Sequence, residues 1–245
     1  MRVLVAIDDT DNAESRGTGF RARTLGARLE SADLATLRGV TRHQLLVHPD
    51  IPYTSHNSAL CLDLEIDAAR RAAVEDFCRE FVRAESAPGS DAGLCVAEWK
   101  RIDDALVDWG RRAQNVVLDL DSATDLAAAT DSVLLEGLTG ERIGAIGALA
   151  AVGLRRTDDD GRFVWLRGVR ELSGIHEAGS LLRETGIEEI RSRDGERPES
   201  GERIRVDPWP RALLVGGRAL LLVDRSTGSK SHEWQLVGRE VIRQH

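Results

Sequence analysis

The alternation of apolar and polar residues in the first part of the chain predicts a regular series of strands and helices. Residues 2–7 are apolar on both faces of an extended chain, which is typical of a central strand buried from two sides. A helix is expected near 20–30, and strands near 35–47 and 58–66. In the latter strand, leucine or isoleucine recurs at every second position from residue 60.

A second helix and a further strand follow. Asp67 can cap a helix whose apolar residues, from Val74 to Val82, recur at three- and four-residue spacing. Residues 94–98 are predicted to form a strand. The resulting order, β-α-β-β-α-β, is the split unit of ferredoxin-like folds. We therefore predict an α+β (α/β) fold with a ferredoxin-like unit over residues 1–100.

The remainder, 101–245, is predicted to be a mixed α/β region that completes a cleft beside this unit. Gly216, Gly217 and Arg218 separate two apolar runs and indicate a β-hairpin. The other elements expected from the pattern are helices at 101–113, 122–135, 141–153 and 173–185, and strands at 115–119 and 163–167.

Composition narrows the class of protein. The chain has 245 residues, of which 42% are hydrophobic, and a formal net charge of −8. Such a charge disfavours a protein that coats nucleic acid, although 31 of the 33 basic residues are arginine, which binds phosphate well. The three cysteines, Cys61, Cys78 and Cys95, form no Cys-x-x-Cys pair, so we expect reduced thiols in the core. Without a signal peptide or a long apolar run, the expected location is cytoplasmic.

The strongest chemical signal is an acidic loop directly after the first strand. Asp8, Asp9 and Asp11 place three carboxylates within four residues. Two carboxylates about 4 Å apart repel by roughly 4 kcal/mol at an effective dielectric near 20, and a cation relieves that repulsion. All three side chains can converge only if the loop bends. Hard oxygen ligands suit Mg²⁺, which is typically held by carboxylates together with substrate phosphates.

The same loop also offers a place for an anion. Gly17 and Gly19 allow close approach of a ligand to the backbone, and the helix that follows presents its N-terminal N–H groups. The order along the chain of an acidic cluster, a glycine-rich turn and the start of a helix fits a magnesium–nucleotide site. The alternative is a polar loop whose aspartates only cap and turn the chain. Residues 140–142, before the glycine-rich helix, form a second possible anion site.

These motifs resemble the archaeal family of 2-agmatinylcytidine synthetases that act on isoleucine tRNA (TiaS). The acidic motif and the Ile-Gly-Ala-Leu-Ala-Ala run carry most of the resemblance. The stretches similar to the family are 6–11, 49–52, 57–59 and 140–153, with a weaker similarity at 207–210 and 216–218. The resemblance does not extend to the family's oligonucleotide-binding and zinc-ribbon domains.

The resemblance implies a TiaS-like fold and an ATP-dependent activity. The family couples ATP hydrolysis to the joining of agmatine to a tRNA cytidine, through a kinase-like domain and a ferredoxin-like domain. It implies that Asp8, Asp9 and Asp11 hold Mg²⁺ and the ATP phosphates, and that Asn57 lies at the same cleft. Thr10 belongs to the same motif. The family's threonine run, which accepts phosphate, corresponds to residues 21–26.

Further residues complete the candidate site. Thr18 is the nearest threonine upstream of 21–26 and is therefore a candidate catalytic residue. His56 lies in a loop rich in hydrogen-bonding groups and can act as a general acid or base, the alternative being a solvated loop histidine. Arg21 or Arg42 could neutralise phosphate charge, although an exposed arginine at a strand end is an equally good interpretation of Arg42.

The sequence therefore predicts an Mg²⁺- and ATP-dependent enzyme. Phosphoryl transfer would activate an acceptor for attack by an amine, with Asp9, Thr18 and His56 as catalytic residues. The acceptor is either a tRNA cytidine or a small molecule. Two other functions remain open: a nucleotide-binding regulatory protein without turnover, and a ferredoxin-like interaction module whose acidic loop is structural.

Overall fold

A computed structural model describes residues 1–52, 57–208, 210–228 and 231–242. The chain forms two compact units, 1–157 and 158–245. The expected boundary after residue 100 differs from this division. Residues 101–157 belong to the first unit because their helices share its hydrophobic core, in which Leu106 and Leu149 pack with Cys95 and Ala97.

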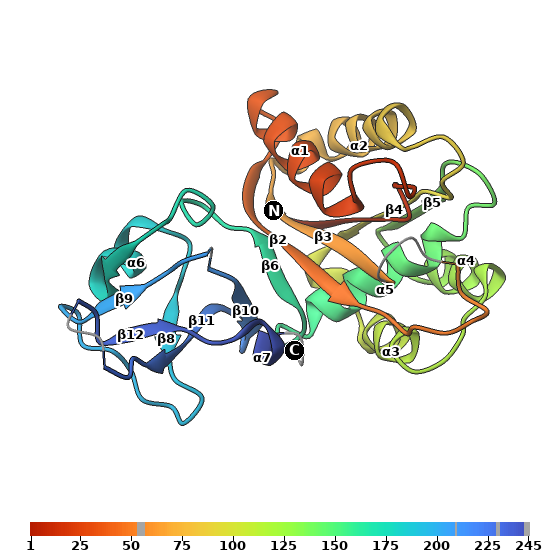
Figure 1. Ribbon diagram of the computed structural model, residues 1–245. Helices are drawn as coiled ribbons and strands as arrows, with labels where there is room; N and C mark the ends of the chain where they lie inside the picture. Colours follow the sequence, from red (N-terminus) through yellow and green to blue (C-terminus); the bar gives the residue numbers. More distant parts are fainter. Residues whose placement is uncertain (53–56, 209, 229–230, 243–245) are drawn as a thin grey trace. The chain divides into compact units, whose positions relative to one another are not determined.

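The first unit is built on an antiparallel sheet with strand order β5-β4-β1-β3-β2. Its first six regular elements follow the predicted β-α-β-β-α-β order (Figure 1). They are β1 (Arg2–Asp8), α1 (Thr18–Ser31), β2 (Thr36–Gln44), β3 (Ser58–Glu65), α2 (Arg71–Glu85) and β4 (Gly93–Glu98), with short 3₁₀ turns at Ala68–Arg70 and Trp99–Arg101. The mixed α/β class and the ferredoxin-like unit are confirmed. β1 is central and buried, as its apolar sequence predicts.

Helices cover both faces of this sheet. α1 and α2 pack on one face, and α5 (Gly144–Arg156) crosses the other, where α3 (Asp104–Ala113) and α4 (Leu120–Ala129) pack against it (Figure 1). Leu4 and Ala6 of β1 belong to the core beneath α5. Because neighbouring side chains of a strand point to opposite faces, Val3, Val5 and Ile7 fill the core beneath α1 and α2.

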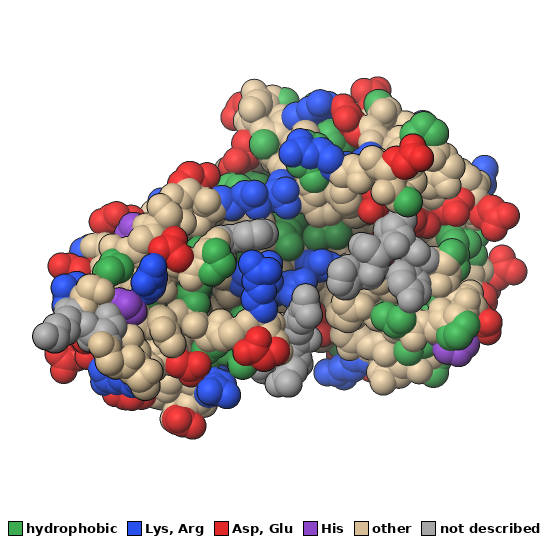
Figure 2. All heavy atoms as spheres, in the orientation of Figure 1, with side chains coloured by type: hydrophobic (Ala, Val, Ile, Leu, Met, Phe, Trp, Pro, Cys, Tyr) green, Lys and Arg blue, Asp and Glu red, His purple; other side chains and the backbone are tan. Residues whose placement is uncertain are grey.

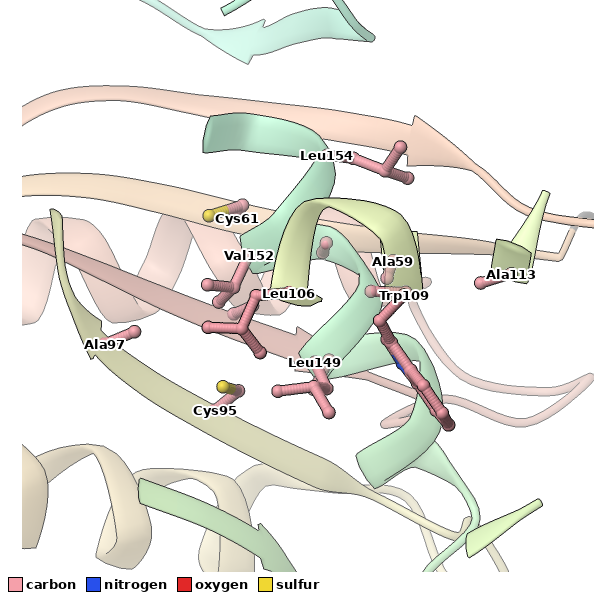
Figure 3. Packing of buried hydrophobic residues seen from close by; sticks show 14 of the residues in the cluster. Ala59, Cys61, Cys95, Ala97, Leu106, Trp109, Ala113, Leu149, Val152 and Leu154 are labelled. Carbon is pink, nitrogen blue, oxygen red and sulfur yellow. The ribbon is translucent and has the colours of Figure 1, made fainter. Parts of the chain in front are cut away.

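The core beneath α5 joins residues from distant parts of the sequence. Leu106 and Trp109 of α3 pack with Leu149 and Val152 of α5 over the small side chains of the sheet (Figure 3). The thiols of Cys61 and Cys95 lie in the same core, and Cys78 is on the buried face of α2. All three cysteines are buried and unpaired, which confirms the expected core thiols. Burial raises the pKa of the Cys78 thiol to about 12.

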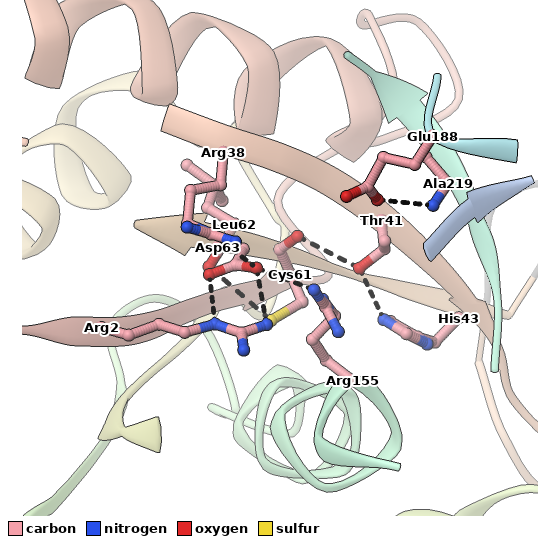
Figure 4. Close-up of polar contacts among 10 residues, drawn as sticks. All are labelled: Arg2, Arg38, Thr41, His43, Cys61, Leu62, Asp63, Arg155, Glu188 and Ala219. Carbon is pink, nitrogen blue, oxygen red and sulfur yellow. Dashed lines mark hydrogen bonds and ion pairs between the residues drawn. The ribbon is translucent and has the colours of Figure 1, made fainter. Parts of the chain in front are cut away.

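A buried carboxylate crosslinks the edge of this core. Asp63 of β3 accepts hydrogen bonds from Arg2 at 2.9 and 2.8 Å and from Arg155 of α5 at 2.7 Å (Figure 4). Arg38 adds an ion pair at 3.7 Å. Since a buried charge is costly unless it is paired, these contacts hold α5 in place on β1 and β3.

Three elements predicted after residue 101 differ from the structure. The helix expected at 173–185 is confined to Ala178–Glu184, because Ile175–Glu177 forms a strand. Residues 115–119 do not form a strand but connect α3 to α4. The helix expected at 122–135 ends at Ala129, and β5 (Val133–Gly137) pairs with the edge of β4 instead. The apolar residues of 133–135 are locally compatible with a helix or a strand. Pairing with the free edge of β4 selects the strand.

The described part of the second unit is a small mixed β structure with two short helices. Leucines and valines of β10 and β11 form the predicted hairpin around Gly216 and Gly217, which both have positive φ angles. Trp234 is fully buried in its core. Its elements are β6 (Arg162–Trp165), β7 (Ile175–Glu177), α6 (Ala178–Glu184), β8 (Glu189–Arg191), β9 (Arg203–Arg205), β10 (Ala212–Val215), β11 (Arg218–Arg225), β12 (Trp234–Leu236) and α7 (Arg239–Ile242).

The surface of the first unit mixes acidic, basic and hydrophobic side chains on the face seen in Figure 2. Among the described residues, no helix is both long enough and apolar enough to span a bilayer.

Candidate functional site

The acidic loop begins where β1 ends in the middle of the sheet. Asp8 is the last residue of β1, and the chain then turns sharply through Asp9, whose φ angle of 49° lies in the left-handed region. The backbone N–H of Asp9 donates a hydrogen bond to Oδ1 of Asp8 at 2.9 Å. The bend brings the three aspartates toward one side of the strand end, as the charge argument required.

The carboxylate of Asp8 lies against α5. A Cβ atom added to Gly147 would come within 1.8 Å of Asp8 Oδ2, so this contact requires glycine. Burial, together with repulsion from Asp9 and Asp11, raises the pKa of Asp8 from 3.8 to about 7, although the Asp9 N–H and Arg42 favour the ionised form. The folded protein therefore disfavours the charged form of Asp8, and such perturbed ionisable groups are common in functional sites.

Asp9 is perturbed in the same direction. Burial, followed by the charges of Asp91 and Asp11, raises the pKa of Asp9 from 3.8 to about 6. Asp91 precedes β4 and was not anticipated from the sequence. Its carboxylate accepts a hydrogen bond from the Glu141 N–H, and its carbonyl accepts one from Gly144 at 2.9 Å. The second anion site expected at 140–142 is thus occupied by a carboxylate of the protein itself.

Asp11 is joined to the start of α1 through two threonines. The hydroxyl of Thr18 donates to Asp11 Oδ1 at 2.7 Å, and the hydroxyl of Thr10 donates to Thr18 Oγ1 at 3.0 Å. Thr10 is fully buried, whereas Thr18 reaches the cleft described next. This chain of hydrogen bonds fixes the Thr18 hydroxyl beside the Asp11 carboxylate.

These groups line one side of an open cleft with about 880 Å³ of space, counted out to its mouth. Four aspartates, Asp8, Asp9, Asp11 and Asp50, contribute to its lining. Of the described residues that line it, none is lysine or arginine. The apolar part of its lining comprises Leu45, Ile51, Pro52, Val116, Val117, Leu118, Ile143 and Ile146. Val116 and Val117 are 45% and 46% exposed, which suits a wall that an apolar ring could cover.

The carboxylates do not form a complete metal cage. Within the residues that the structure describes, no group of three or more His, Cys, Asp and Glu side chains could hold a metal ion. Mg²⁺ is usually bound by one or two protein carboxylates plus phosphate oxygens and water. The donor set of Asp8 and Asp9 therefore fits magnesium that arrives with a phosphate ligand.

The remaining predicted residues are divided between the cleft and its surroundings. Asn57 lines the cleft, but its side-chain amide donates to the Leu46 carbonyl at 2.6 Å and so holds the loop after β2. Gly17 is the N-cap of α1, and the carboxylate of Asp11 lies against this end of the helix, since a Cβ on Gly17 would come within 3.6 Å of Asp11 Oδ2. Gly19 lies in the first turn of the same helix.

The two candidate arginines contact the protein itself. Arg21 donates to the Glu85 carbonyl at 2.6 Å and to the Arg16 carbonyl, and it does not line the cleft. Arg42 donates to Ser58 Oγ at 2.8 Å, and Ser58 does line the cleft. His56 lies outside the described residues.

Comparisons with known proteins place this geometry in a wider context. No family model matches the sequence, and no curated protein matches it. Solved structures do match. The crystal structure of apo TiaS, a tRNA agmatidine synthetase, has a TM-score of 0.54 and 26% identity over 62% of this chain and 35% of that one. The fold resembles that of TiaS.

Two ligand-bound TiaS structures give similar values. The complex of TiaS with its isoleucine tRNA and ATP matches with a TM-score of 0.55 and 28% identity, over 62% of this chain and 36% of that one. The complex of TiaS with the same tRNA, AMPCPP and agmatine matches with a TM-score of 0.52 and 27% identity over the same shares. The chain thus spans about a third of the length of the TiaS structures that it matches.

Sequence reasoning missed three parts of the cleft. Gly147 lies in the glycine-rich run 140–153, where it accommodates the Asp8 carboxylate. Asp50 and the wall at 116–118 also line the cleft. The spacing of small residues in 140–153 was the available signal for α5, whereas no local pattern distinguishes a cleft wall from an ordinary connection.

Proposed function

We propose that this chain is an ATP-dependent enzyme of the TiaS type, which transfers a phosphoryl group and thereby activates an acceptor for attack by an amine. The observation that carries the proposal is the meeting of Asp8, Asp9, Asp11 and the Thr18 hydroxyl at one cleft, in a fold that resembles TiaS. The solved TiaS complexes contain tRNA, ATP and agmatine, which supports ATP as the donor and tRNA as the acceptor. A small-molecule acceptor is the alternative.

Each residue has a separate role in this proposal. Asp8 and Asp9, with Asp11 beside them, would hold magnesium together with the phosphates of ATP. When bound, that ion would neutralise charge that develops on the transferred group. The N-terminus of α1, at Gly17 and Gly19, would bind a phosphate through its N–H groups. The apolar wall at 116–118 would cover the adenine ring.

Thr18 would act closest to the transferred group. Its hydroxyl donates to Asp11, so Asp11 can accept the proton when the hydroxyl oxygen attacks a phosphoryl group of ATP and the bond from that group to the rest of the nucleotide, which leaves, is broken. Residues 21–26, which match the family's threonine run in sequence, offer a different candidate. Thr24 of this run donates to the Phe20 carbonyl within α1 at 3.0 Å and does not line the cleft.

Incubation with Mg²⁺ and ATP, followed by chromatographic resolution of the nucleotide products, tests the proposal directly. Product formation that requires Mg²⁺ is the expected result. Tight binding of Mg²⁺–ATP in calorimetry without any product would instead support the regulatory alternative. An absence of both binding and turnover would leave the acidic loop as a structural feature of an interaction module.

A pair of threonine variants tests the assignment of Thr18. Thr18→Val should reduce turnover about hundredfold or more, because it removes the hydroxyl held between Asp11 and Thr10, whereas Thr18→Ser should retain activity. Thr24→Val is the matched control on the same helix and should change turnover by less than about twofold, since a surface substitution away from the site has little effect. The opposite ranking in steady-state ATP turnover would move the catalytic role to the 21–26 run.

A further inference from the structure

Asp91 lies in the connection between α2 and β4 and is not among the described residues that line the cleft. This connection is anchored on the acidic loop. Ala87 donates its N–H to the Thr10 carbonyl at 2.9 Å, and the side chain of Asn12 donates to the Pro88 carbonyl at 3.1 Å. One side of the connection therefore holds the loop that carries the aspartates of the cleft.

The other side of the same connection holds the turn before α5. Thr139 donates its hydroxyl to the Ser90 carbonyl at 2.7 Å and accepts the Ala92 N–H at 2.8 Å. The Leu138 N–H donates to the Ala92 carbonyl at 2.7 Å. The connection is thus fixed at the same time to the acidic loop and to the turn, which are far apart in the sequence.

Asp91 makes two hydrogen bonds that fix the start of α5. Its carboxylate accepts the N–H of Glu141, and its backbone carbonyl accepts the N–H of Gly144 at 2.9 Å. The turn passes so close that a Cβ on Gly140 would come within 1.9 Å of Asp91 Oδ1. Gly140 has a φ angle of 52°, in the left-handed region that glycine adopts without strain. The turn is therefore folded around the Asp91 carboxylate.

The start of α5 also lies against the end of β1. A Cβ on Gly144 would come within 2.6 Å of the Asp91 carbonyl oxygen and 2.8 Å of the Asp8 carbonyl oxygen. One turn later, the carboxylate of Asp8 lies directly against Gly147. Because hydrogen bonds join successive turns of a helix, a shift of the start of α5 would move Gly147 relative to Asp8.

Asp91 is also close enough to the acidic loop for its charge to act there. Burial, followed by the charge of Asp91, raises the pKa of Asp9 to about 6. The carboxylate of Asp91 is nevertheless used by the Glu141 N–H. Asp91 therefore lies beside the candidate magnesium ligands while its own oxygen holds a neighbouring segment.

We propose that Asp91 is a positioning residue, which holds the start of α5 on the acidic loop and thereby keeps the Asp8 and Asp9 carboxylates in place. The inference rests on the proposed function, in which those carboxylates hold magnesium with the phosphates of ATP. The hydrogen bond to the Glu141 N–H carries the effect, rather than the charge of Asp91. Asparagine can accept the same hydrogen bond without the charge, so the two contributions are separable.

Steady-state ATP turnover of Asp91→Ala and Asp91→Asn tests this proposal. Asp91→Ala should lower kcat per folded molecule at least about tenfold, since a displacement of about 1 Å at a reactive group can cost roughly hundredfold. Asp91→Asn should retain kcat within about threefold, because its amide oxygen can accept the Glu141 N–H. Asp67→Ala is the control and should leave kcat unchanged. Asp67 accepts the Ala69 N–H at 3.0 Å, just after β3 and near the opposite end of β1 from Asp8.

Amide hydrogen exchange of the metal-free protein, followed by NMR, tests the positioning without turnover. In Asp91→Ala the N–H of Glu141 should exchange about fivefold faster, the change expected from the loss of one capping hydrogen bond. The N–H of Asp9, which donates to Asp8 Oδ1 at 2.9 Å, should also exchange faster, because Asp91 holds the acidic loop through the start of α5. Both N–H groups should keep wild-type protection in Asp91→Asn.

Each outcome decides the proposal. A loss of kcat in Asp91→Asn equal to that in Asp91→Ala would overturn it, since the charge would then carry the effect. Wild-type kcat in Asp91→Ala, or faster exchange at Glu141 alone, would show a purely structural hydrogen bond and would also overturn it. If Asp91→Ala does not fold, Gly140→Ala replaces it, since the added Cβ would displace the same carboxylate. If the wild-type protein has no ATP turnover, the proposed function fails, and exchange at Asp9 still decides whether Asp91 holds the acidic loop.

Discussion

Replacing Asp8 with asparagine should abolish ATP turnover and stabilise the protein at the same time. Asp8 is the carboxylate at the end of β1 that lines the cleft, and under the proposed function its removal would deprive the site of a magnesium ligand and of a charge near the phosphates. We expect turnover to fall about a thousandfold, as when an electrostatic group of an active site is removed. Stability should rise because the folded protein confines the charged form of Asp8 beside α5 and two other aspartates.

The stabilisation by Asp8→Asn should depend on pH in a defined way. Burial and the neighbouring charges raise the pKa of Asp8 from 3.8 to about 7, so the folded state binds the proton more tightly than the unfolded state. The resulting cost is absent below about pH 4, grows between pH 4 and 7, and is constant above pH 7. The gain from asparagine should follow the same course.

Urea unfolding at pH 4 and pH 8 in the presence of EDTA measures this effect without a bound cation. Asp119→Asn is a suitable control, because Asp119 caps α4 and hydrogen bonds to Ser122 lower its pKa. The pKa of Asp119 is lowered rather than raised, and asparagine also caps helices. Asp119→Asn should therefore give no gain in stability at high pH. An Asp8→Asn protein that is less stable than wild type at pH 8 would contradict the account of a strained carboxylate.

Replacing Gly147 with alanine should disrupt the site from the opposite side. The new methyl group would lie 1.8 Å from Asp8 Oδ2 and 3.2 Å from Leu45 Cδ1, so Asp8 or α5 must move. Overpacking of this kind costs about 1–3 kcal/mol of stability. A displacement of about 1 Å at a reactive group can reduce the rate roughly hundredfold, and we expect a loss of that size in turnover per folded molecule.

Gly153→Ala provides the matched control on the same helix. Its Cβ would come within 1.9 Å of the Leu106 carbonyl oxygen, where α5 packs on α3 away from the aspartates. Both variants should therefore lose stability in thermal unfolding, but only Gly147→Ala should lose turnover once the folded fraction is taken into account. Equal losses of turnover would indicate that α5 affects activity only through stability.

The variants at Asp8 and Gly147 both change the contact between the end of β1 and α5. β1 supplies charges at the end of the sheet, and α5 supplies a helix without side chains at the positions of closest approach. Gly93 and Gly144 allow the same closeness one turn earlier, because a Cβ on Gly93 would come within 2.1 Å of the Ala145 nitrogen. The cleft therefore depends on small residues in 140–153 as much as on the aspartates.

The local sequence was sufficient for the elements that a hydrophobic pattern specifies. The apolar residues of 2–7 could be accommodated only by a central strand, and the spacing in α2 only by a helix with one buried face. The order of elements then limits the sheet to very few topologies, and the observed order β4-β1-β3-β2 is that of the predicted unit. The position of the acidic loop follows, since it is fixed by the end of β1.

The tertiary structure decided which polar groups meet, because those contacts join residues far apart in the sequence. Arg21 and Asn57 resemble ligand-binding residues in sequence, yet each donates hydrogen bonds to backbone carbonyls. The direction of Thr18 toward Asp11 depends on the bend at Asp9, which no local preference specifies. Asp91 reaches the acidic loop only because β4 pairs with β1, which places Asp8 opposite Gly93. Local sequence patterns predict which residues are buried and whether a segment is a helix or a strand. Which charged side chains meet depends on how distant segments pack together.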